Sequence, residues 1–423
     1  MAVKPEIMNY RIVIIGAGPG GYETAVAAAK KGMEVVLVSE GPLGGTCLNE
    51  GCIPTKTLVR WASSGMALAD IQVRKQEVVN QLRSGIEFLM KNPLISLVEG
   101  RARLVRGEDG KVKVLVGDVL YEGDRIIIAT GSTSASLPVP GAERCITSKE
   151  MLELDEVPER LCIIGGGVIG LEFASIFNQL GSKVTVLEYC KQILPRFDTD
   201  IAKRLKQCLT KSGIEIRTGY QVTDINEIEA DKVLMAVGRR PAVGGIGLED
   251  VGVEFSARGI VVDENMQTSV PGVYAIGDVV GGMMLAHVAS FQGKRALNHI
   301  MGETDRIRFD IVPAAVFTTP EVATVGLAEE DCKAKEIEFC AYKSFYRANG
   351  KAVSMGETDG YCKILAEKES GRILGAHIMG AHSSDMIHEI CALMNLNATV
   401  DDMRNIIHAH PTLSEVIQLA LPE

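Results

Sequence analysis

The chain has 423 residues, enough for two or three domains. Its hydrophobic content of 46% and charged content of 23% are those of an ordinary soluble globular protein. A net charge of -10 argues against nucleic acid or an anionic membrane as the main partner. The sequence contains no apolar run of the ~18 residues that a membrane span needs. The N-terminal segment MAVKPEIMNY lacks the basic-then-apolar pattern of a signal peptide, so a cytoplasmic location is expected.

The first motif is a glycine turn between a strand and a helix. Residues 10–15, YRIVII, read as a buried strand, and an alanine-rich helix then runs to about Lys31 before a second strand at 34–38. The turn between them, GAGPGG, has glycines at positions 16, 18 and 21. In this context GxGxxG indicates dinucleotide binding, because the glycines let a pyrophosphate approach the helix N-terminus.

The acid that would bind the ribose lies slightly out of register. The usual position at the end of the second strand is occupied by Ser39, and Glu40 follows one residue later. We expect Glu40 to take the ribose role.

Two cysteines lie close together in GGTCLNEGCIPTK, residues 44–56. Cys47 and Cys52 are five positions apart, and Pro54 suits the first position of a helix. Cys52 is therefore expected near a helix N-terminus, where partial positive charge favours the thiolate that attacks disulfides. The ten cysteines are too few and too scattered for a disulfide framework. In a reducing compartment, a disulfide between Cys47 and Cys52 would be catalytic.

The next part of the chain continues the first domain. Residues 54–91 read as two helices, the second at about 71–91, and residues 94–132 hold strands. The last of these strands ends in a turn, Ala129–Ser132, where backbone can approach a ligand. Residues 137–143, LPVPGAE, read as a linker.

The strand–glycine–helix pattern then repeats. LCIIGGGVIG has glycines at 165, 167 and 170, a helix follows at 171–181, and a strand spans 183–188. Glu188 ends that strand, 23 residues after Gly165. An acid there accepts hydrogen bonds from a ribose 2′-hydroxyl and repels a 2′-phosphate, which favours NAD(H) over NADP(H).

The last third of the chain contains one further strand and helix and then changes character. The strand at 268–278 ends in Gly277–Asp278 and precedes a helix at 284–301; Asp278 alone could be an ordinary helix-capping acid. From about residue 306, short strands are followed by helices at 383–396, 400–407 and 412–420, a pattern typical of an α+β domain.

The C-terminal motif is HAHPTLSEV. With Pro411 at a first helical position, His410 would lie at the cap and Glu415 in the early turns. A carboxylate that reaches a histidine nitrogen fixes its tautomer and raises its basicity. By itself the motif also fits a surface histidine and a helix-dipole glutamate.

Taken in order, these motifs resemble the class I pyridine nucleotide–disulfide oxidoreductases, and among them the dihydrolipoamide dehydrogenase group. The resemblance covers essentially the whole chain, from GAGPGG and GGTCLNEGCIPTK through ATGS, GGGVIGLE, VGRRP and GVYAIGD to HAHPTLSE. It implies an α/β fold with two Rossmann-like dinucleotide-binding domains, for FAD and NAD, and a C-terminal α+β dimerisation domain. The implied segments are 1–143 (FAD, first part), 144–266 (NAD), 267–305 (FAD, completing part) and 306–423 (interface).

The resemblance also implies the cofactor residues. The FAD site would be lined by Gly16, Gly18, Gly21, Glu40, Thr46, Lys56, Ser132, Asp278 and Ala286, with a backbone contact from Ala102 to the adenine. The NAD site would be lined by Gly165, Gly167, Gly170, Glu188, Val222 and Gly238. A lysine–glutamate pair beside the flavin maps onto Lys56 and Glu172.

The implied reaction is the oxidation of protein-bound dihydrolipoamide to lipoamide, with NAD+ as the acceptor. Cys47 would exchange with the substrate, Cys52 would be the thiolate facing the flavin, and His410 of the partner subunit would be the acid–base, oriented by Glu415. The implied partners are a second copy in a homodimer and the lipoyl domain of a 2-oxo acid dehydrogenase or glycine cleavage complex. Alternatives are a glutathione- or mercuric-reductase-like enzyme, or chiefly a docking subunit of an acyltransferase complex.

The chain also departs from typical members of the family. It is shorter, segment 57–75 is trimmed, and only about a dozen residues, 219–230, separate the strand IEIRT from the next one. Much of the strand hairpin that the resemblance implies for the NAD-binding unit is therefore expected to be missing.

Overall fold

The computed structural model describes residues 6–422. Its chain forms two compact units, each assembled from separate segments. The first unit contains residues 1–57, 72–135 and 238–307, and the second contains residues 58–71, 136–237 and 308–423. The divisions at 57/58 and 71/72 fall within the helices α3 (Cys52–Ala62) and α4 (Leu68–Leu89).

The first unit is built on a sheet with the strand order β3-β2-β1-β6-β5-β4, in which β16 also pairs with β6. The parallel part consists of β1 (Glu6–Ile15), β2 (Val35–Ser39), β3 (Ile95–Glu99), β6 (Val119–Ile128) and β16 (Val273–Ala275). The strands β4 (Ala102–Arg106) and β5 (Val112–Val116) extend it in antiparallel pairing. Every residue of β2 is buried, as expected for a parallel strand that is covered on both faces.

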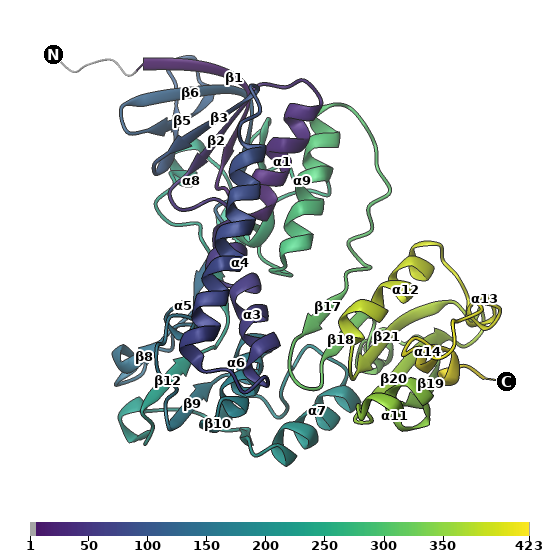
Figure 1. Ribbon diagram of the computed structural model, residues 1–423. Coiled ribbons are helices and arrows are strands. Elements are labelled where there is room, and N and C mark those ends of the chain that lie inside the picture. The colour runs from purple at the N-terminus through teal and green to yellow at the C-terminus, as the bar shows by residue number, and fades with distance from the viewer. Residues whose placement is uncertain (1–5, 423) are drawn as a thin grey trace. The chain divides into compact units, whose positions relative to one another are not determined.

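Two helices of this unit pack closely because their contact residues are small. Helix α1 (Pro19–Lys30) and helix α9 (Ala286–Ile300) lie side by side (Figure 1). A Cβ atom on Gly293 would lie 1.9 Å from the Thr24 hydroxyl, and one on Gly20 would lie 3.2 Å from the Ala289 side chain. The alanine-rich sequence of α1 is thus the consequence of a close helix–helix contact.

Short elements complete the first unit. Helix α2 (Gly45–Glu50) precedes α3, and β7 (Ser132–Ser134) pairs antiparallel with β13 (Arg239–Pro241). The remaining elements are the 3-10 turn η3 (Gly277–Val280), helix α8 (Leu248–Val251) and the strand pair β14 (Phe255–Ser256) and β15 (Gly259–Ile260).

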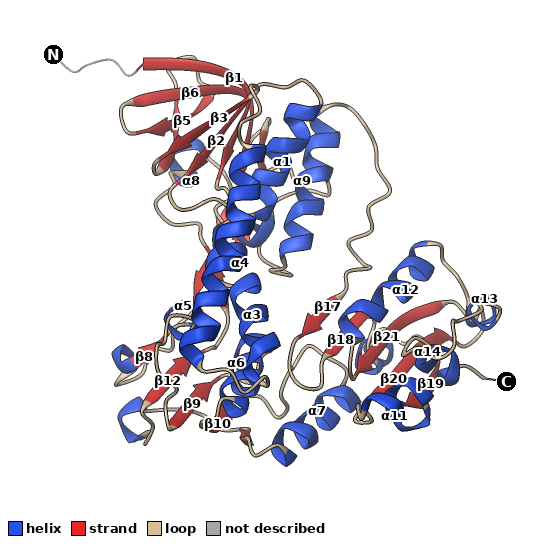
Figure 2. Cartoon of the chain, in the orientation of Figure 1, coloured by secondary structure: helices blue, strands red, loops and turns tan. Residues whose placement is uncertain are grey.

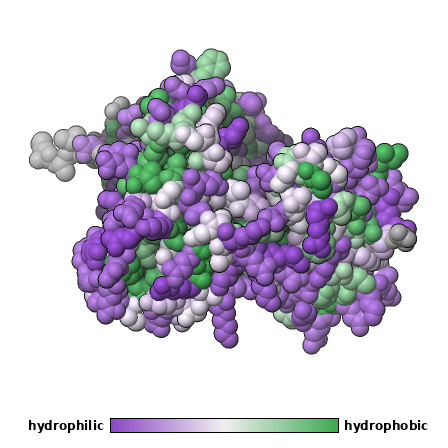
Figure 3. All heavy atoms as spheres, turned by 60° about the horizontal axis from the view of Figure 1, so that its bottom comes forward, coloured by the Kyte–Doolittle hydropathy of each residue, from purple (hydrophilic) through white to green (hydrophobic). Residues whose placement is uncertain are grey.

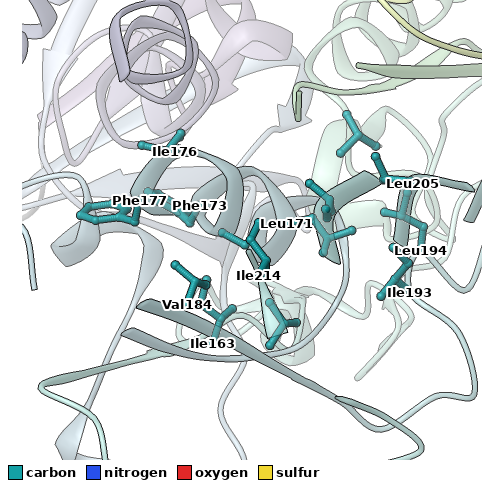
Figure 4. Close-up of a cluster of buried hydrophobic side chains, with 14 of the residues drawn as sticks. Ile163, Leu171, Phe173, Ile176, Phe177, Val184, Ile193, Leu194, Leu205 and Ile214 are labelled. Atoms are coloured by element: carbon teal, nitrogen blue, oxygen red, sulfur yellow. The ribbon is translucent and has the colours of Figure 1, made fainter. Parts of the chain in front are cut away.

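The second unit contains a parallel sheet with the order β11-β10-β9-β12-β8. Its strands are β8 (Cys145–Ile146), β9 (Arg160–Ile164), β10 (Lys183–Glu188), β11 (Glu215–Thr218) and β12 (Lys232–Met235), and its helices are α5 (Ser148–Met151), α6 (Val168–Gln179) and α7 (Thr199–Lys211). Figure 4 shows side chains of α6, including Leu171 and Phe173, beside Ile163 and Val184 of the strands. Residues 219–231 contain no strand, only the 3-10 turn Ile225–Glu227, which matches the shortening seen in the sequence.

A second, antiparallel sheet of this unit has the order β17-β18-β21-β20-β19 (Figure 2). Its strands are β17 (Ala314–Val316), β18 (Val322–Gly326), β19 (Phe339–Phe345), β20 (Tyr361–Glu367) and β21 (Ile373–Met379). The helices around it are α10 (Glu329–Ala334), α11 (Gly350–Met355), α12 (Ser383–Asn395), α13 (Val400–Arg404) and α14 (Glu415–Ala420). Helices α12 and α14 pack against its strands through buried aliphatic side chains such as Ile387 and Ile417.

The hydropathy of the surface and of the helices agrees with the balance of hydrophobic and charged residues in the sequence. Hydrophilic residues cover most of the face shown in Figure 3, and the apolar residues on it gather in small groups. Within residues 6–422, no helix is both long and apolar enough to cross a bilayer. The predicted fold class, two Rossmann-like sheets followed by an α+β domain, is confirmed.

Several local predictions were incomplete. The sequence did not lead us to predict the elements β4, β7, α2, α7, α10 and α11. It also made two helices too long, because α13 ends at Arg404 and α14 begins only at Glu415. Pro411 is therefore not the first residue of a helix, and His410 lies in a loop rather than at a helix cap.

Candidate functional site

The first glycine turn is shaped by two very close backbone approaches and one open position. Gly16 has φ +106°, and a Cβ there would lie 2.3 Å from the carbonyl oxygen of Ala129. A Cβ on Gly21 would lie 1.8 Å from the carbonyl oxygen of Gly16. At Gly18, in contrast, an added Cβ would meet nothing within 4 Å. The outer two glycines therefore allow the turn, and the middle one leaves open space at the N-terminus of α1, where a pyrophosphate would approach.

The predicted FAD residues of the later motifs lie at the same edge of the sheet. Backbone hydrogen bonds align the strand ends, with Ala129 N donating to Ile15 O at 2.8 Å and Ile276 N donating to Ile128 O at 2.9 Å. Beyond these ends, the Ser132 hydroxyl donates to Asp278 Oδ2 at 2.5 Å. The edge at which nucleotides bind in open α/β sheets thus carries both residues.

One residue at this edge was missed by the sequence reading. Arg239 donates from Nε to Ser132 Oγ and from Nη2 to the Ser132 carbonyl oxygen, both at 2.7 Å. It lies on β13, more than a hundred residues from Ser132, so only the β7–β13 pairing brings them together. The motif VGRRP was recognised in the sequence, but the contact of its Arg239 with Ser132 was not predicted.

The two candidates for the FAD ribose differ in exposure. Ser39 is 7% exposed, and its hydroxyl donates to Gly41 O at 2.7 Å. Glu40 is exposed. The ribose role of Glu40 stays a prediction.

The cysteine segment packs directly on the first glycine turn. Gly44 N donates to Ala17 O at 2.9 Å, and a Cβ on Gly45 would lie 2.7 Å from the Cα of Gly18. The segment is more helical than expected, because Cys47 lies in α2 and Cys52 is the first residue of α3. Pro54 is consequently the third residue of α3 and not the first. The prediction that Cys52 lies at a helix N-terminus is correct.

The two thiols interact with each other. A hydrogen bond with Cys52, followed by burial, raises the pKa of Cys47 far above its usual value, although the charge of Lys56 acts in the opposite direction. Cys47 is half-buried and Cys52 is exposed. Cys52 lies at the start of α3, where the partial positive charge of a helix N-terminus favours a thiolate.

The second glycine turn repeats the geometry of the first. Gly165 has φ +112°, with an added Cβ 2.3 Å from Ala236 O, and a Cβ on Gly170 would lie 2.0 Å from Gly165 O. Gly167 again has nothing within 4 Å. The same combination of two tight positions and one open one indicates a second dinucleotide site.

Glu188 lies at the predicted position beside this turn. It is 7% exposed, and its carboxylate accepts hydrogen bonds from Gly166 N at 2.5 Å and from Cys190 N at 2.6 Å. An acid held against the glycine turn is placed to accept hydrogen bonds from a ribose and to repel a 2′-phosphate.

The remaining predicted cofactor residues are found in varied surroundings. Thr46 is exposed on α2, Lys56 is half-buried on α3, Ala102 is buried at the start of β4, and Ala286 begins α9. Gly238 is exposed, with φ +116° and open space around it, whereas Val222 packs against buried residues of β9, β10 and β12.

Glu172 is 3% exposed, and its Oε1 accepts a hydrogen bond from Phe317 N at 3.0 Å. The Lys56–Glu172 pair stays a prediction.

The C-terminal dyad is formed within the chain. His410 Nδ1 lies 2.9 Å from Glu415 Oε1, and Thr412 N donates to Glu415 Oε2 at 2.8 Å. The hydrogen bond from the Thr412 backbone N–H, followed by that from the His410 ring, lowers the pKa of Glu415 below its usual value. The His410 side chain is 78% exposed, so its other ring nitrogen is accessible to a substrate or a second subunit.

Comparison with known proteins identifies the family. Residues 10–293 match the pyridine nucleotide-disulphide oxidoreductase family, and residues 312–421 match the dimerisation domain of that family. The chain belongs to this family. It is 38% identical to a dihydrolipoyl dehydrogenase of Bacillus subtilis, over 97% of each chain. It is 40% identical to one of Chlamydia muridarum, over 96% of this chain and 94% of that relative.

Among solved structures, the flavoprotein disulfide reductase RclA of Escherichia coli superposes with a TM-score of 0.90 at 32% identity, over 96% of this chain and 98% of that one. The Bacillus subtilis alignment runs over 453 positions although this chain has 423 residues, so that relative carries segments that are absent here.

Family membership defines the class of enzyme. The protein is a disulfide oxidoreductase that uses FAD and NAD(H), and its C-terminal dimerisation domain implies a homodimer. The glycine turns fit two dinucleotides, because each leaves open space at the N-terminus of a long helix while its other glycines are tightly packed.

Proposed function

We propose that the protein oxidises the dihydrolipoamide of a lipoyl domain to lipoamide, with NAD+ as the final acceptor. The observation that carries this proposal is the Cys47–Cys52 pair, which is mounted on the glycine turn of the first dinucleotide site through Gly44 and Gly45. The names of the similar Bacillus subtilis, Geobacillus stearothermophilus and Chlamydia muridarum proteins support the substrate.

The chemistry of the cysteine pair follows from the two thiols. A substrate thiolate attacks Cys47 Sγ of the Cys47–Cys52 disulfide, and Cys52 Sγ leaves as a thiolate that the start of α3 stabilises. The second substrate thiol then loses its proton and attacks the substrate sulfur of the mixed disulfide. This step releases lipoamide and leaves Cys47 reduced. Two substrate thiols are oxidised and one protein disulfide is reduced, so electrons and protons balance.

His410 is the proposed acid–base for this exchange. A neutral imidazole accepts the proton of the attacking substrate thiol, and the Glu415 carboxylate on the opposite ring nitrogen stabilises the resulting imidazolium. The high exposure of His410 and the fixed Glu415 support this role. Following the resemblance, we propose that His410 acts on the cysteine pair of the partner subunit.

The cofactors connect the dithiol to the nicotinamide. FAD, when bound, supplies the route by which the electron pair of the reduced cysteines becomes a hydride on NAD+. We propose that the first glycine turn, Glu40, Ser132 and Asp278 hold FAD. The second glycine turn, Glu188 and Gly238 would hold NAD, and Lys56 with Glu172 would adjoin the flavin.

The proposed organisation has FAD segments at 1–143 and 267–305, an NAD segment at 144–266 and an interface segment at 306–423. As partners we propose a second copy of the chain and the lipoyl domain of a 2-oxo acid dehydrogenase or glycine cleavage complex.

Substitution of either cysteine tests the function. Cys47→Ser and Cys52→Ser should each abolish dihydrolipoamide oxidation with NAD+ while the purified protein keeps its flavin absorbance. As a matched control, Cys208→Ser changes a half-buried cysteine of α7, which belongs to neither proposed cofactor site. Full dihydrolipoamide activity in either active-site variant would refute the proposed role of the pair.

A substrate comparison separates this proposal from its alternatives. The wild-type protein should oxidise dihydrolipoamide with NAD+ much faster than it reduces glutathione disulfide or Hg(II) with NADPH. The opposite preference would favour a glutathione- or mercuric-reductase-like enzyme. Binding to an acyltransferase core without either activity would favour a docking subunit.

A further inference from the structure

The loop that carries His410 connects α13 with α14 and contains a second histidine. His408 lies two residues before His410, but the two side chains differ sharply in exposure, 6% for His408 and 78% for His410. In this loop, therefore, one histidine is directed into the protein and the other is directed outward.

Both ring nitrogens of His408 lie against oxygen atoms. Nε2 donates to Oε1 of Glu389 at 3.0 Å, and Nδ1 is 3.2 Å from the carbonyl oxygen of Ile406. Glu389 belongs to α12, a helix of 13 residues packed on the antiparallel sheet through Met386, Ile387 and Ile390. The Glu389–His408 contact therefore joins the loop to a rigid helix.

The other side of the loop is also fixed. Asn349 is 1% exposed; its Nδ2 donates to the carbonyl oxygen of Thr412 at 3.0 Å, and its Oδ1 accepts from Ala352 N. Residues 409–411 thus lie between two anchors, His408 on one side and Thr412 on the other.

We propose that the Glu389–His408 pair is a positioning device that holds the His410 loop in place for thiol exchange. This inference rests on the proposed acid–base role of His410. An imidazole that must meet a substrate thiol and Cys47 tolerates little displacement, because a misplacement of about 1 Å can slow a reaction about a hundredfold. Glu415 orients the His410 ring from within its own segment, whereas Glu389 fixes the backbone on which that ring is carried.

The test compares two reactions of the same flavin-loaded dimer. Dihydrolipoamide oxidation needs His410, whereas reduction of ferricyanide by NADH passes electrons to an outer acceptor and needs no thiol exchange. For Glu389→Leu we expect kcat with dihydrolipoamide to fall about tenfold to a hundredfold with KM nearly unchanged. Ferricyanide reduction should stay within about twofold of wild type, since it does not use His410.

Matched variants show whether the effect passes through His410. Glu369→Leu makes the same chemical change at an exposed turn and should leave both reactions unaltered. Glu389→Gln keeps an oxygen acceptor for His408 and should recover most of the lost kcat. In a His410→Gln background, Glu389→Leu should cause no further loss, because the positioned group is already gone.

Each outcome supports or refutes the positioning role of the Glu389–His408 pair. Wild-type kcat with dihydrolipoamide in a folded Glu389→Leu protein overturns the inference, and so does an equal fall of both reactions. If Glu389→Leu does not fold, the two reactions are compared in His408→Gln instead. The glutamine amide cannot reach both Glu389 Oε1 and the Ile406 carbonyl oxygen, so the loop loses one of its contacts. Absence of dihydrolipoamide oxidation in the wild-type protein, with ferricyanide reduction intact, would instead refute the proposed function.

Discussion

Replacement of Lys363 by methionine should destabilise the second unit strongly. Lys363 lies on β20 and is 1% exposed; its Nζ is 2.8 Å from Asp198, 2.9 Å from Asp200 and 2.7 Å from Glu329. Asp198, the N-cap of α7, is fully buried. The methionine would fill most of the same space but would leave the Asp198 carboxylate buried without its cation. Removing one partner of a buried ion pair costs about 3–5 kcal/mol.

The assay is thermal unfolding followed by circular dichroism, with flavin content recorded for each sample. A loss of this size corresponds to a fall in Tm of about 10 °C for a unit of this length. Lys333→Met is the matched control, because Lys333 contacts the same Glu329 at 3.4 Å but is 64% exposed. Its loss should cost at most about 1 kcal/mol. Equal stability of the Lys363 and Lys333 variants would refute the reasoning.

The same cluster predicts a pH dependence. Burial raises the pKa of Asp198, Asp200 and Glu329. The charge of His377 and then the bond with Lys363 outweigh burial for Asp198, and the bond with Lys363 does so for Asp200 and Glu329, so each pKa lies below its usual value. Their stabilisation is therefore present above about pH 4 and is lost as the pH falls through the folded values, about 2 for Asp200. The stability difference between wild type and Lys363→Met should accordingly shrink between about pH 4 and pH 2. A constant difference over that range would contradict the ionic origin of the effect.

Two further predictions concern the nucleotide sites. Glu188→Arg should shift the ratio of NADH to NADPH affinity toward NADPH by about tenfold to a hundredfold, measured by titration of the protein with each nucleotide; an unchanged ratio would show that Glu188 is not at the ribose. Gly18→Ala should fold normally but lose FAD, because its Cβ enters the open space of the turn. Gly21→Ala should lose about 1–3 kcal/mol of stability, because its Cβ lies 1.8 Å from a carbonyl oxygen. Flavin absorbance and Tm distinguish the two glycine variants, and similar flavin loss without destabilisation in both would contradict the distinction.

The sequence predicted those parts of the fold whose signals are local. A glycine turn between a strand and a helix indicates a dinucleotide-binding segment of about 30 residues, and both such segments were predicted in this way. Strand β4 was missed because two of its five residues, Arg103 and Arg106, are charged, and the strand lies at the edge of its sheet. Helix α7 was missed although Asp198 and the spacing of Ile201 and Leu205 mark a capped amphipathic helix.

The contacts that were not predicted join residues distant in the sequence. Arg239 reaches Ser132, Gly45 touches Gly18, and Glu389 holds His408 only because the fold brings them together. The motifs identify which residues carry the chemistry. They do not identify the residues that hold them in position, since those residues belong to no motif and are chosen by packing.

The segment after β11 folds back against the backbone beside Glu188. No strand occupies residues 219–231, yet Tyr220 N donates to Glu188 O at 2.9 Å and Gly219 N donates to Cys190 O at 2.8 Å directly after β11. The chain therefore turns back beside Glu188. Because the Glu188 carboxylate is held by the backbone of Gly166 and Cys190, the nucleotide preference should not depend on residues 221–231.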